Sequence, residues 1–370
     1  MFEESFEKIA DYNSTIQQRN YDVLKECVGS RKLFIYGSGL GSKPIVTSLQ
    51  TSRIPISGVC DSHKKGIFPL TGDVIISPQE LQENNPDALV LITSLKFQSE
   101  IYASLRSLGF PSEQILFFPG VAGSLITVDE FVETHYEGYK FAYDALSDGV
   151  SKKTLIGMMN AFISGVPQMP VDYFPEYFEK GIFKLYQNEV FVDAGVMYGE
   201  TIEMFILQCM KAGVKYKKIY GFEPHPKNFN MAIEELENFS DIELVPKGLW
   251  SHETELVFNL RDASGSSFQQ ERGSGDTLTV STTSLDEYFA RINDLPTFIK
   301  MDIEGAEQEA LQGAKNVIVS NRPKLAIAAY HKIDDVYEFI KIIREFCPEY
   351  RFELRKHGTG VAGHCIYAYI

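Results

Sequence analysis

Apolar and polar positions divide the chain into two stretches in which strand patterns alternate with helix patterns. In the second stretch, short apolar runs typical of buried strands lie at 190–192, 218–222, 242–245, 299–301 and 325–329. After Gly199, the residues Ile202, Phe205, Ile206 and Cys209 recur on one helical face, as in a helix that covers a sheet. Buried strands separated by such helices indicate an α/β fold with a mostly parallel sheet.

The first stretch has the same alternation on a smaller scale. Apolar strands are expected at 33–36, 56–61, 88–93 and 114–118, with a helix that contains Ile101, Leu105 and Leu108 before the last of them. Since 370 residues exceed one ordinary core, we expect separate domains. The predicted parts are an N-terminal helix at 1–28, a small Rossmann-like α/β domain at 29–120, a helical connector at 121–188 and a larger α/β domain at 189–370.

Acidic residues follow three strands of the larger domain. Asp193, Glu223 and Asp302 each stand where an apolar run ends, and Glu304 comes two residues after Asp302. Ligands of open α/β sheets bind outside the carboxyl ends of the strands, so these acids should converge on one crevice. The pattern predicts a polar, cationic ligand.

The glycines beside the first acid narrow the choice of ligand. Gly195 permits a tight turn, and Gly199 lets the start of the next helix approach a ligand closely. Glu223 stands where a carboxylate receives the two hydroxyls of a ribose, in a nicotinamide enzyme as well as in other nucleotide-binding folds. The gap between the glycines differs from Gly-x-Gly-x-x-Gly, and Asp193 would repel a pyrophosphate. A sulfonium ligand suits the site better.

Four ordered motifs carry a family resemblance. They are Asp193-Ala194-Gly195, Gly221-Phe222-Glu223-Pro224, Thr283-Ser284-Leu285-Asp286-Glu287-Tyr288 and Ile299-Lys300-Met301-Asp302-Ile303-Glu304-Gly305-Ala306-Glu307. Residues 188–370 thereby resemble the FkbM family of S-adenosylmethionine-dependent methyltransferases. The resemblance implies a seven-stranded class I methyltransferase sheet, with S-adenosylmethionine across the ends of its first and second strands. Acceptors in this family are usually hydroxyls of sugars or natural products.

The resemblance also implies roles for individual residues. Asp193, Gly195 and Gly199 would bind the amino-acid end of the cofactor and shape the turn beside it, and Glu223 would bind its ribose. Asp302 and Glu304 would face the transferred methyl group, with Asp302 also contacting the cofactor. Val196, Met197 and Tyr198 replace the small or Asn residues usual after the first glycine.

Catalytic candidates lie at the ends of two strands. Tyr330 and His331 end an apolar run that class I strand order places beside Asp302, so His331 is the preferred general base, with a pKa expected near neutrality. Asp302 or Glu304 could take the proton instead, or could bind a divalent cation, for which no third ligand is evident. Lys300 and Glu307 are interpreted as surface or helix-start residues.

Composition limits the partners. A net charge of -15 argues against nucleic acid, and a small-molecule or saccharide acceptor is expected. No apolar run reaches the roughly 18 residues of a membrane span. The acidic N-terminus and five scattered cysteines indicate the cytoplasm. The oligomeric state stays open, with a homodimer among the options.

Two other classes of function remain open. Gly37, Gly39, Gly41 and Asp61 could serve a nicotinamide-dependent, sugar-modifying enzyme, although one gap is too short for the dinucleotide fingerprint. Asp61 would then bind a ribose. Alternatively, the chain is a non-catalytic binding protein that keeps a cofactor fold.

Overall fold

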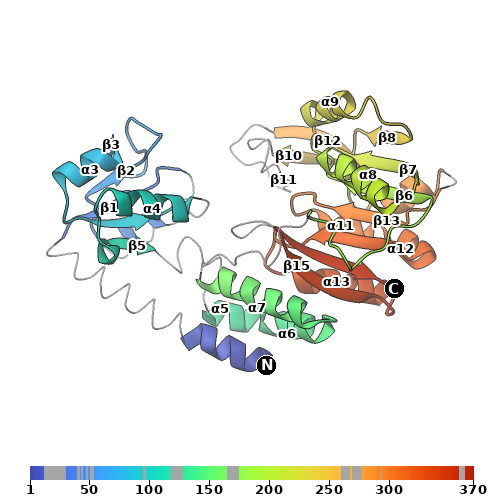
Figure 1. Cartoon of the computed structure of the whole chain (residues 1–370), viewed down its shortest axis with the longest axis horizontal. Coiled ribbons are helices and arrows are strands. Elements are labelled where there is room, and N and C mark those ends of the chain that lie inside the picture. The colour runs from blue at the N-terminus through green and yellow to red at the C-terminus, as the bar shows by residue number, and fades with distance from the viewer. Residues whose placement is uncertain are drawn as a thin grey trace. The chain divides into compact units, whose positions relative to one another are not determined.

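The chain forms two compact units in the computed structural model (Figure 1). Unit 1 comprises Met1–Tyr136 and Ile156–Gln168, and unit 2 comprises Glu137–Leu155 and Met169–Ile370. The structure describes residues 1–11, 31–39, 42, 45–46, 49–50, 54–94, 97–117, 128–164, 175–259, 267–268, 277–292, 294–357 and 363–370. Among them, no helix is both long enough and apolar enough to span a membrane.

Unit 1 contains a five-stranded parallel sheet in the order β3-β2-β1-β4-β5. Its strands are β1 (Leu33–Tyr36), β2 (Gly58–Cys60), β3 (Ile75–Ile76), β4 (Leu89–Ile92) and β5 (Ile115–Phe117). Helices α3 (Pro78–Asn84) and α4 (Gln98–Ser107) follow β3 and β4, and residues 2–11 are helical. The four predicted strands are confirmed. The two-residue β3 is too short to show a periodic pattern and was not predicted.

Three helices lie in the described part of the predicted connector. They are α5 (Val128–Thr134), α6 (Tyr136–Ala145) and α7 (Gly149–Ser164), and α7 is divided between the two units. The described residues 175–188 contain no helix and instead contribute Tyr177 and Phe178 to the core of unit 2. The predicted domain boundaries stay a prediction, and residues 12–30, 118–127 and 165–174 lie outside the described part.

Unit 2 contains the predicted seven-stranded sheet, in the order β15-β16-β14-β13-β6-β7-β8. Strands β14, β13, β6, β7 and β8 are parallel, and β16 is antiparallel to both β14 and β15. The strands are β6 (Glu189–Ala194), β7 (Tyr216–Phe222), β8 (Ile242–Val245), β13 (Phe298–Met301), β14 (Lys324–Ala328), β15 (Arg351–Lys356) and β16 (His364–Tyr369). The chain turns from β8 back to the other side of β6, which makes the carboxyl ends of β6 and β13 a topological switch point.

Six helices and a small second sheet accompany the large sheet in the described residues after 188. The helices are α8 (Glu200–Ala212), α9 (Pro226–Glu235), α10 (Leu285–Phe289), α11 (Glu307–Gln312), α12 (Lys315–Asn321) and α13 (Asp335–Phe346). The second sheet has the order β11-β10-β12-β9, formed by β9 (Gly248–Leu249), β10 (Glu255–Asn259), β11 (Ser267–Phe268) and β12 (Thr277–Thr283). Gly213, with φ 68°, ends α8 in the left-handed conformation that favours glycine.

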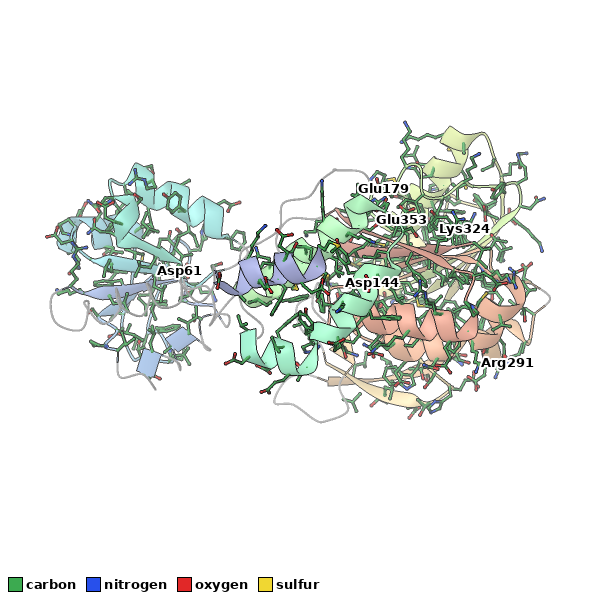
Figure 2. The ribbon with its side chains drawn as sticks, turned by 90° about the horizontal axis from the view of Figure 1, so that it is seen from below. Asp61, Asp144, Glu179, Arg291, Lys324 and Glu353 are labelled. Atoms are coloured by element: carbon green, nitrogen blue, oxygen red, sulfur yellow. The ribbon has the colours of Figure 1, made fainter. Side chains whose placement is uncertain are left out.

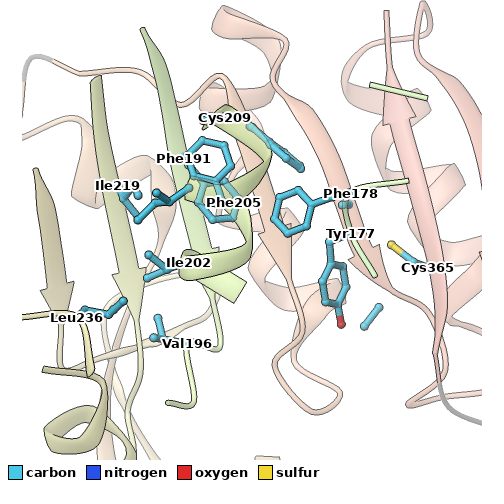
Figure 3. Close-up of a cluster of buried hydrophobic side chains, with 14 of the residues drawn as sticks. Tyr177, Phe178, Phe191, Val196, Ile202, Phe205, Cys209, Ile219, Leu236 and Cys365 are labelled. Carbon is cyan, nitrogen blue, oxygen red and sulfur yellow. The ribbon is translucent and has the colours of Figure 1, made fainter. Parts of the chain in front are cut away.

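An aromatic core fixes α8 against the sheet (Figure 3). Phe191 of β6 stacks on Phe205 of α8 with ring centroids 4.2 Å apart, and Phe178 packs against both rings. Side chains two residues apart on a strand share a face. Asp193 lies two residues after Phe191, and Lys300 lies two residues after Phe298. The side chains of Asp193 and Lys300 therefore point to the same face of the sheet as these two rings.

Candidate active site

A buried ion pair joins β6 to β13 at the edge of the candidate site. Lys300 lies opposite Asp193 in the strand register, and its Nζ is 2.8 Å from Asp193 Oδ1. The two side chains are 2% and 0% exposed. Burial raises the pKa of Asp193 and would lower that of Lys300, but the charges of Asp193, Asp302 and Glu176 together outweigh burial and raise the pKa of Lys300. The interpretation of Lys300 as a surface residue is therefore wrong.

Lys300 also holds the turn that follows β6. Its Nζ donates to the carbonyl oxygens of Ala194 at 3.1 Å and Gly195 at 2.7 Å. A lysine inside an otherwise apolar buried strand is rarely tolerated without a partner. The position of Lys300 within this apolar run was therefore the feature of the sequence from which its pair with Asp193 could have been predicted.

Gly195 is required by a close approach of two loops. Its φ is 82°, and a Cβ at this position would lie 1.9 Å from the carbonyl oxygen of Asp302. The N–H of Asp302 in turn donates to the carbonyl oxygen of Ala194 at 3.1 Å. The glycine therefore allows the loops after β6 and β13 to pack together. The sequence analysis had explained Gly195 only by a tight turn beside a ligand.

Gly199 begins α8 with φ 102°, a conformation that favours glycine. A Cβ here would lie 3.0 to 3.3 Å from the side-chain carbons of Leu236. Its N–H donates to the carbonyl oxygen of Val196 at 2.9 Å and closes the turn. Packing against Leu236 thus accounts for this glycine without a ligand.

Glu223 connects the ends of β6 and β7. Its Oε2 accepts the N–H of Met197 at 2.9 Å, and its Oε1 accepts the N–H of His225 at 2.8 Å. The residue is 6% exposed, and burial raises its pKa despite these hydrogen bonds. Each carboxylate oxygen can accept two hydrogen bonds, so both retain one acceptor position for further donors.

His331 brings the remaining acids together beside β14. Its Nε2 lies 3.4 Å from Asp302 Oδ1 and 3.5 Å from Glu304 Oε2, and its Nδ1 lies 3.1 Å from Glu307 Oε1. Glu307, the first residue of α11, is fully buried and also accepts the N–H of Ile303 at 2.8 Å. The structure therefore brings together the predicted catalytic residues His331, Asp302 and Glu304, and adds Glu307 to them.

The charges in this cluster change its titration. Burial disfavours the imidazolium, but the close contact with Glu307 and the charges of the surrounding carboxylates outweigh burial and raise the pKa of His331 to about 9. Burial raises the pKa of Glu304 to about 7, against the opposing charge of His331. The near-neutral pKa expected for His331 is wrong, because three carboxylates surround the ring.

Tyr177 is a site residue that the sequence analysis missed. Its hydroxyl donates to Asp302 Oδ2 at 2.8 Å, and Lys300 Nζ lies 5.3 Å from the centre of its ring. The Tyr330 hydroxyl is a second, longer donor to Asp302 Oδ1 at 3.4 Å. Tyr177 comes from the segment before β6, where no strand or helix pattern indicated its position.

Three groups in the cluster could hold a metal ion. One ligand atom each from Asp302, Glu307 and His331 lie within 4.8 Å of one another. Oxygen and imidazole ligands of this kind suit several divalent cations. Of the two ligands considered from the sequence, Asp302 belongs to this group and Glu304 does not, and Glu307 and His331 join Asp302 instead.

A cavity of about 690 Å³ lies elsewhere in unit 2. Its lining includes Phe298, the first residue of β13, and Lys211 and Ala212 at the end of α8. These positions are at the amino end of the strands. The cavity is therefore separate from the cluster at the carboxyl ends of β13 and β14.

The strand order and the edge that carries the acids define a Rossmann-like class I methyltransferase fold. Residues 193–354 match the family described as Methyltransferase FkbM domain, and residues 29–116 match the family described as C2185-like, N-terminal. The larger domain thus matches the FkbM methyltransferase domain family, and the N-terminal domain matches a separate family.

One of the solved structures that the chain resembles agrees with this fold. The chain is similar over 100% of its length, and over 99% of the other chain, to the crystal structure of methyltransferase FkbM from Methylobacillus flagellatus KT, with a TM-score of 0.72 and 23% identity. Two weaker likenesses have TM-scores of 0.32, which is too low to support an argument. They are to precorrin-6y C5,15-methyltransferase from Geobacter metallireducens GS-15, with 12% identity over 50% of this chain and 82% of that one, and to Aeropyrum pernix fibrillarin in complex with S-adenosyl-L-methionine, with 11% identity over 52% and 71%. No curated protein matches the chain.

Proposed function

We propose that unit 2 is an S-adenosylmethionine-dependent O-methyltransferase that acts on a hydroxyl of a saccharide, sugar nucleotide or related metabolite. One observation carries the proposal. Glu223, which keeps free acceptor positions after β7, shares the carboxyl edge of the sheet with the cluster of Asp302, Glu304 and His331 after β13 and β14. Such an edge suits a ligand with ribose hydroxyls at one end and a reacting cation at the other.

The cofactor-binding residues divide into two groups. Glu223 receives the ribose hydroxyls through its remaining acceptor positions, and the partly exposed turn at Gly195 borders the amino-acid end of the cofactor. Asp193 has no exposed surface, so it acts through Lys300 to hold that turn. Gly199 sets the start of α8 through its contact with Leu236.

Methyl transfer requires little covalent chemistry from the protein. When bound, S-adenosylmethionine supplies a methyl group on a sulfonium: the new O–CH₃ bond forms as the S–CH₃ bond breaks, and that electron pair stays on sulfur. The protein must align the acceptor hydroxyl and remove its proton. His331 already holds a proton at neutral pH, so a carboxylate is the better acceptor.

We assign the proton-accepting role to Glu304 and a positioning role to Asp302. Glu304 is 40% exposed and close to its titration midpoint at neutral pH, which suits a general base. Asp302 is held by Tyr177 and Tyr330 and faces the same imidazole. His331 stays charged and keeps the two carboxylates together.

A divalent cation is the alternative occupant of this cluster. It would bind Asp302, Glu307 and His331 and lower the pKa of the acceptor hydroxyl. Activity that is lost with EDTA and restored by Mg²⁺ or Mn²⁺ would favour the cation. Full activity in EDTA would favour proton transfer to Glu304 alone.

Calorimetric titration tests the proposal. S-adenosylmethionine, S-adenosylhomocysteine and NAD are titrated into wild type, Glu223→Ala and the exposed control Glu237→Ala. We expect the two sulfur ligands to bind wild type and the control, and to lose affinity in Glu223→Ala. Binding of NAD alone, or sulfur ligands indifferent to Glu223, would overturn the proposed site. A following screen of sugars and nucleotide sugars with labelled methyl donor tests the acceptor class.

A further inference from the structure

Unit 1 has a cavity of its own at the carboxyl edge of its sheet. The cavity measures about 680 Å³, within the range of small-molecule sites. Gly37, Asp61 and Thr93, which follow β1, β2 and β4, all line it. Because the strand order turns between β1 and β4, this edge is a topological switch point, where α/β sheets bind ligands.

The carboxylate of Asp61, labelled in Figure 2, already accepts four hydrogen bonds from within the protein. Its Oδ2 accepts the N–H of Ser38 at 2.9 Å and the Ser38 hydroxyl at 2.7 Å. Its Oδ1 accepts the N–H groups of His63 at 2.9 Å and Lys64 at 3.0 Å. These four bonds fill the acceptor positions of the carboxylate. The hypothesis that Asp61 binds a ribose is therefore not supported. Gly41, the third glycine of the dinucleotide interpretation, lies outside the described residues.

The same hydrogen bonds place a cation over the glycine turn. They fix the backbone of Lys64, whose Nζ lies 4.0 Å from the position of a Cβ built on Gly39. No described carboxylate forms an ion pair with Lys64, and its side chain belongs to the cavity lining. The turn itself is tight, because a Cβ on Gly37 would lie 2.9 Å from Thr93 Oγ1. This end of the cavity suits an anion.

The rest of the lining is rich in hydroxyls and has an apolar side. Ser94 and Ser104 supply hydroxyls. The Ser42 hydroxyl donates to the carbonyl oxygen of Gly39, and the Ser62 hydroxyl is hydrogen-bonded to the Tyr36 hydroxyl. The side chain of Phe97, 48% exposed, lies with Ile101 on the α4 side. Hydroxyls pair with the hydroxyls of a sugar, and an exposed aromatic ring can stack on a flat base. A ligand that contains an anionic group, a sugar and a base would therefore use all parts of this lining.

We propose that unit 1 binds a nucleoside diphosphate sugar, with its phosphates at Lys64 and the turn from Gly37 to Gly39. This site is distinct from the cofactor site proposed in unit 2 and does not depend on it. It would give unit 1 a sugar site that recognises phosphate.

The test uses the full chain with UDP-glucose, UDP, glucose and NAD in calorimetric titrations. We compare wild type with Lys64→Met and with Lys65→Met, a neighbouring exposed lysine outside the cavity lining. UDP-glucose should bind wild type and Lys65→Met equally, and about tenfold or more weaker to Lys64→Met, because a charge-assisted contact to phosphate is lost. Ser94→Tyr, which places a bulky ring in the cavity, should also weaken binding.

Hydrogen exchange identifies where the ligand binds. UDP-glucose should protect peptides that contain residues 36–39, 61–64 and 97–104 and leave unit 2 unchanged. No binding of UDP-glucose or UDP, equal binding to Lys64→Met and wild type, binding of NAD alone, or protection confined to unit 2 would each overturn the proposal. S-adenosylmethionine binding by the same preparation checks unit 2 separately, so a failure here does not affect the methyltransferase proposal.

Discussion

Lys300 and Asp193 form a buried ion pair across neighbouring strands, and Lys300 uses the same ammonium to hold the carbonyl oxygens of the turn after β6. The turn with Gly195 is thereby tied to the strand that leads into Asp302 and Glu304. The turn proposed to border the cofactor and the strand proposed to lead into the methyl-transfer residues are therefore joined by one buried ammonium group.

Removal of this cation should destabilise unit 2. Lys300→Met leaves Asp193 as an uncompensated buried charge, which costs about 3–5 kcal/mol of unfolding free energy. Urea unfolding followed by the fluorescence of Trp250, the one tryptophan of the chain, measures the loss. The exposed Lys211→Met should change little, and Lys300→Met with Asp193→Leu should recover much of the stability. A single variant as stable as wild type would contradict the role of the pair.

Gly195 can be tested against a matched glycine. Gly195→Ala combines an unfavourable φ with a Cβ 1.9 Å from the Asp302 carbonyl oxygen, whereas Gly181, with φ 94°, has no atom within 4 Å of such a Cβ. Both variants carry backbone strain, so only Gly195→Ala should separate the loops after β6 and β13. We expect a clear loss of S-adenosylmethionine affinity in Gly195→Ala alone, measured by calorimetry. Equal affinities in the two variants would show that loop packing does not shape the cofactor site.

Tyr177 should affect the methyl-transfer step more than cofactor binding. Tyr177→Phe removes the hydrogen bond to Asp302 Oδ2 and keeps the ring beside Lys300. A hydrogen bond to a charged group contributes about 1.5–3 kcal/mol, so kcat should fall about tenfold or more while the affinity for S-adenosylmethionine is unchanged. The control is Tyr186→Phe, whose residue is 64% exposed. A loss in cofactor affinity with unchanged kcat would assign Tyr177 to the cofactor half instead.

The strand ends were predictable from the sequence because buried parallel strands are continuous apolar runs and the acids that follow them interrupt these runs. Asp193, Glu223, Asp302 and His331 therefore lie at the expected ends of β6, β7, β13 and β14. What the sequence could not supply was contact between distant segments. Tyr177 and Asp302 are 125 positions apart in the sequence, and no local sequence pattern indicates that their side chains are in contact.

Titration was the least predictable property, because it depends on every neighbour of a group. His331 was expected near neutrality from its position beside acids, but the contribution of Glu307 was unknown until α11 was placed. Glu307 was correctly interpreted as a helix-start residue, yet its complete burial came from packing that the first-turn pattern does not show.

Glu223 should be sensitive even to its isosteric amide. In Glu223→Gln one of the two oxygens becomes an NH₂ group, which cannot accept the N–H of Met197 or His225. One backbone donor then loses its partner, the loops after β6 and β7 separate, and affinity for both sulfur ligands should fall. Calorimetry measures the loss. Undiminished affinity in Glu223→Gln would mean that the carboxylate neither holds the loops nor binds the ribose.

Acid stability offers a separate test of unit 1. Burial would raise the pKa of Asp61, but the backbone hydrogen bonds from His63, Ser38 and Lys64 outweigh it and lower the pKa to about 2. A carboxyl group whose pKa is depressed on folding contributes stability above its unfolded pKa of about 3.9 and loses it as the pH falls through the folded value. The protection of residues 33–39 and 58–64 against hydrogen exchange should therefore decline between about pH 4 and pH 2. Asp61→Asn should lower this protection at neutral pH and flatten its decline in acid, relative to the exposed control Asp87→Asn. If wild type and Asp61→Asn lose protection in parallel, the four hydrogen bonds of Asp61 do not stabilise the loop that forms the cavity.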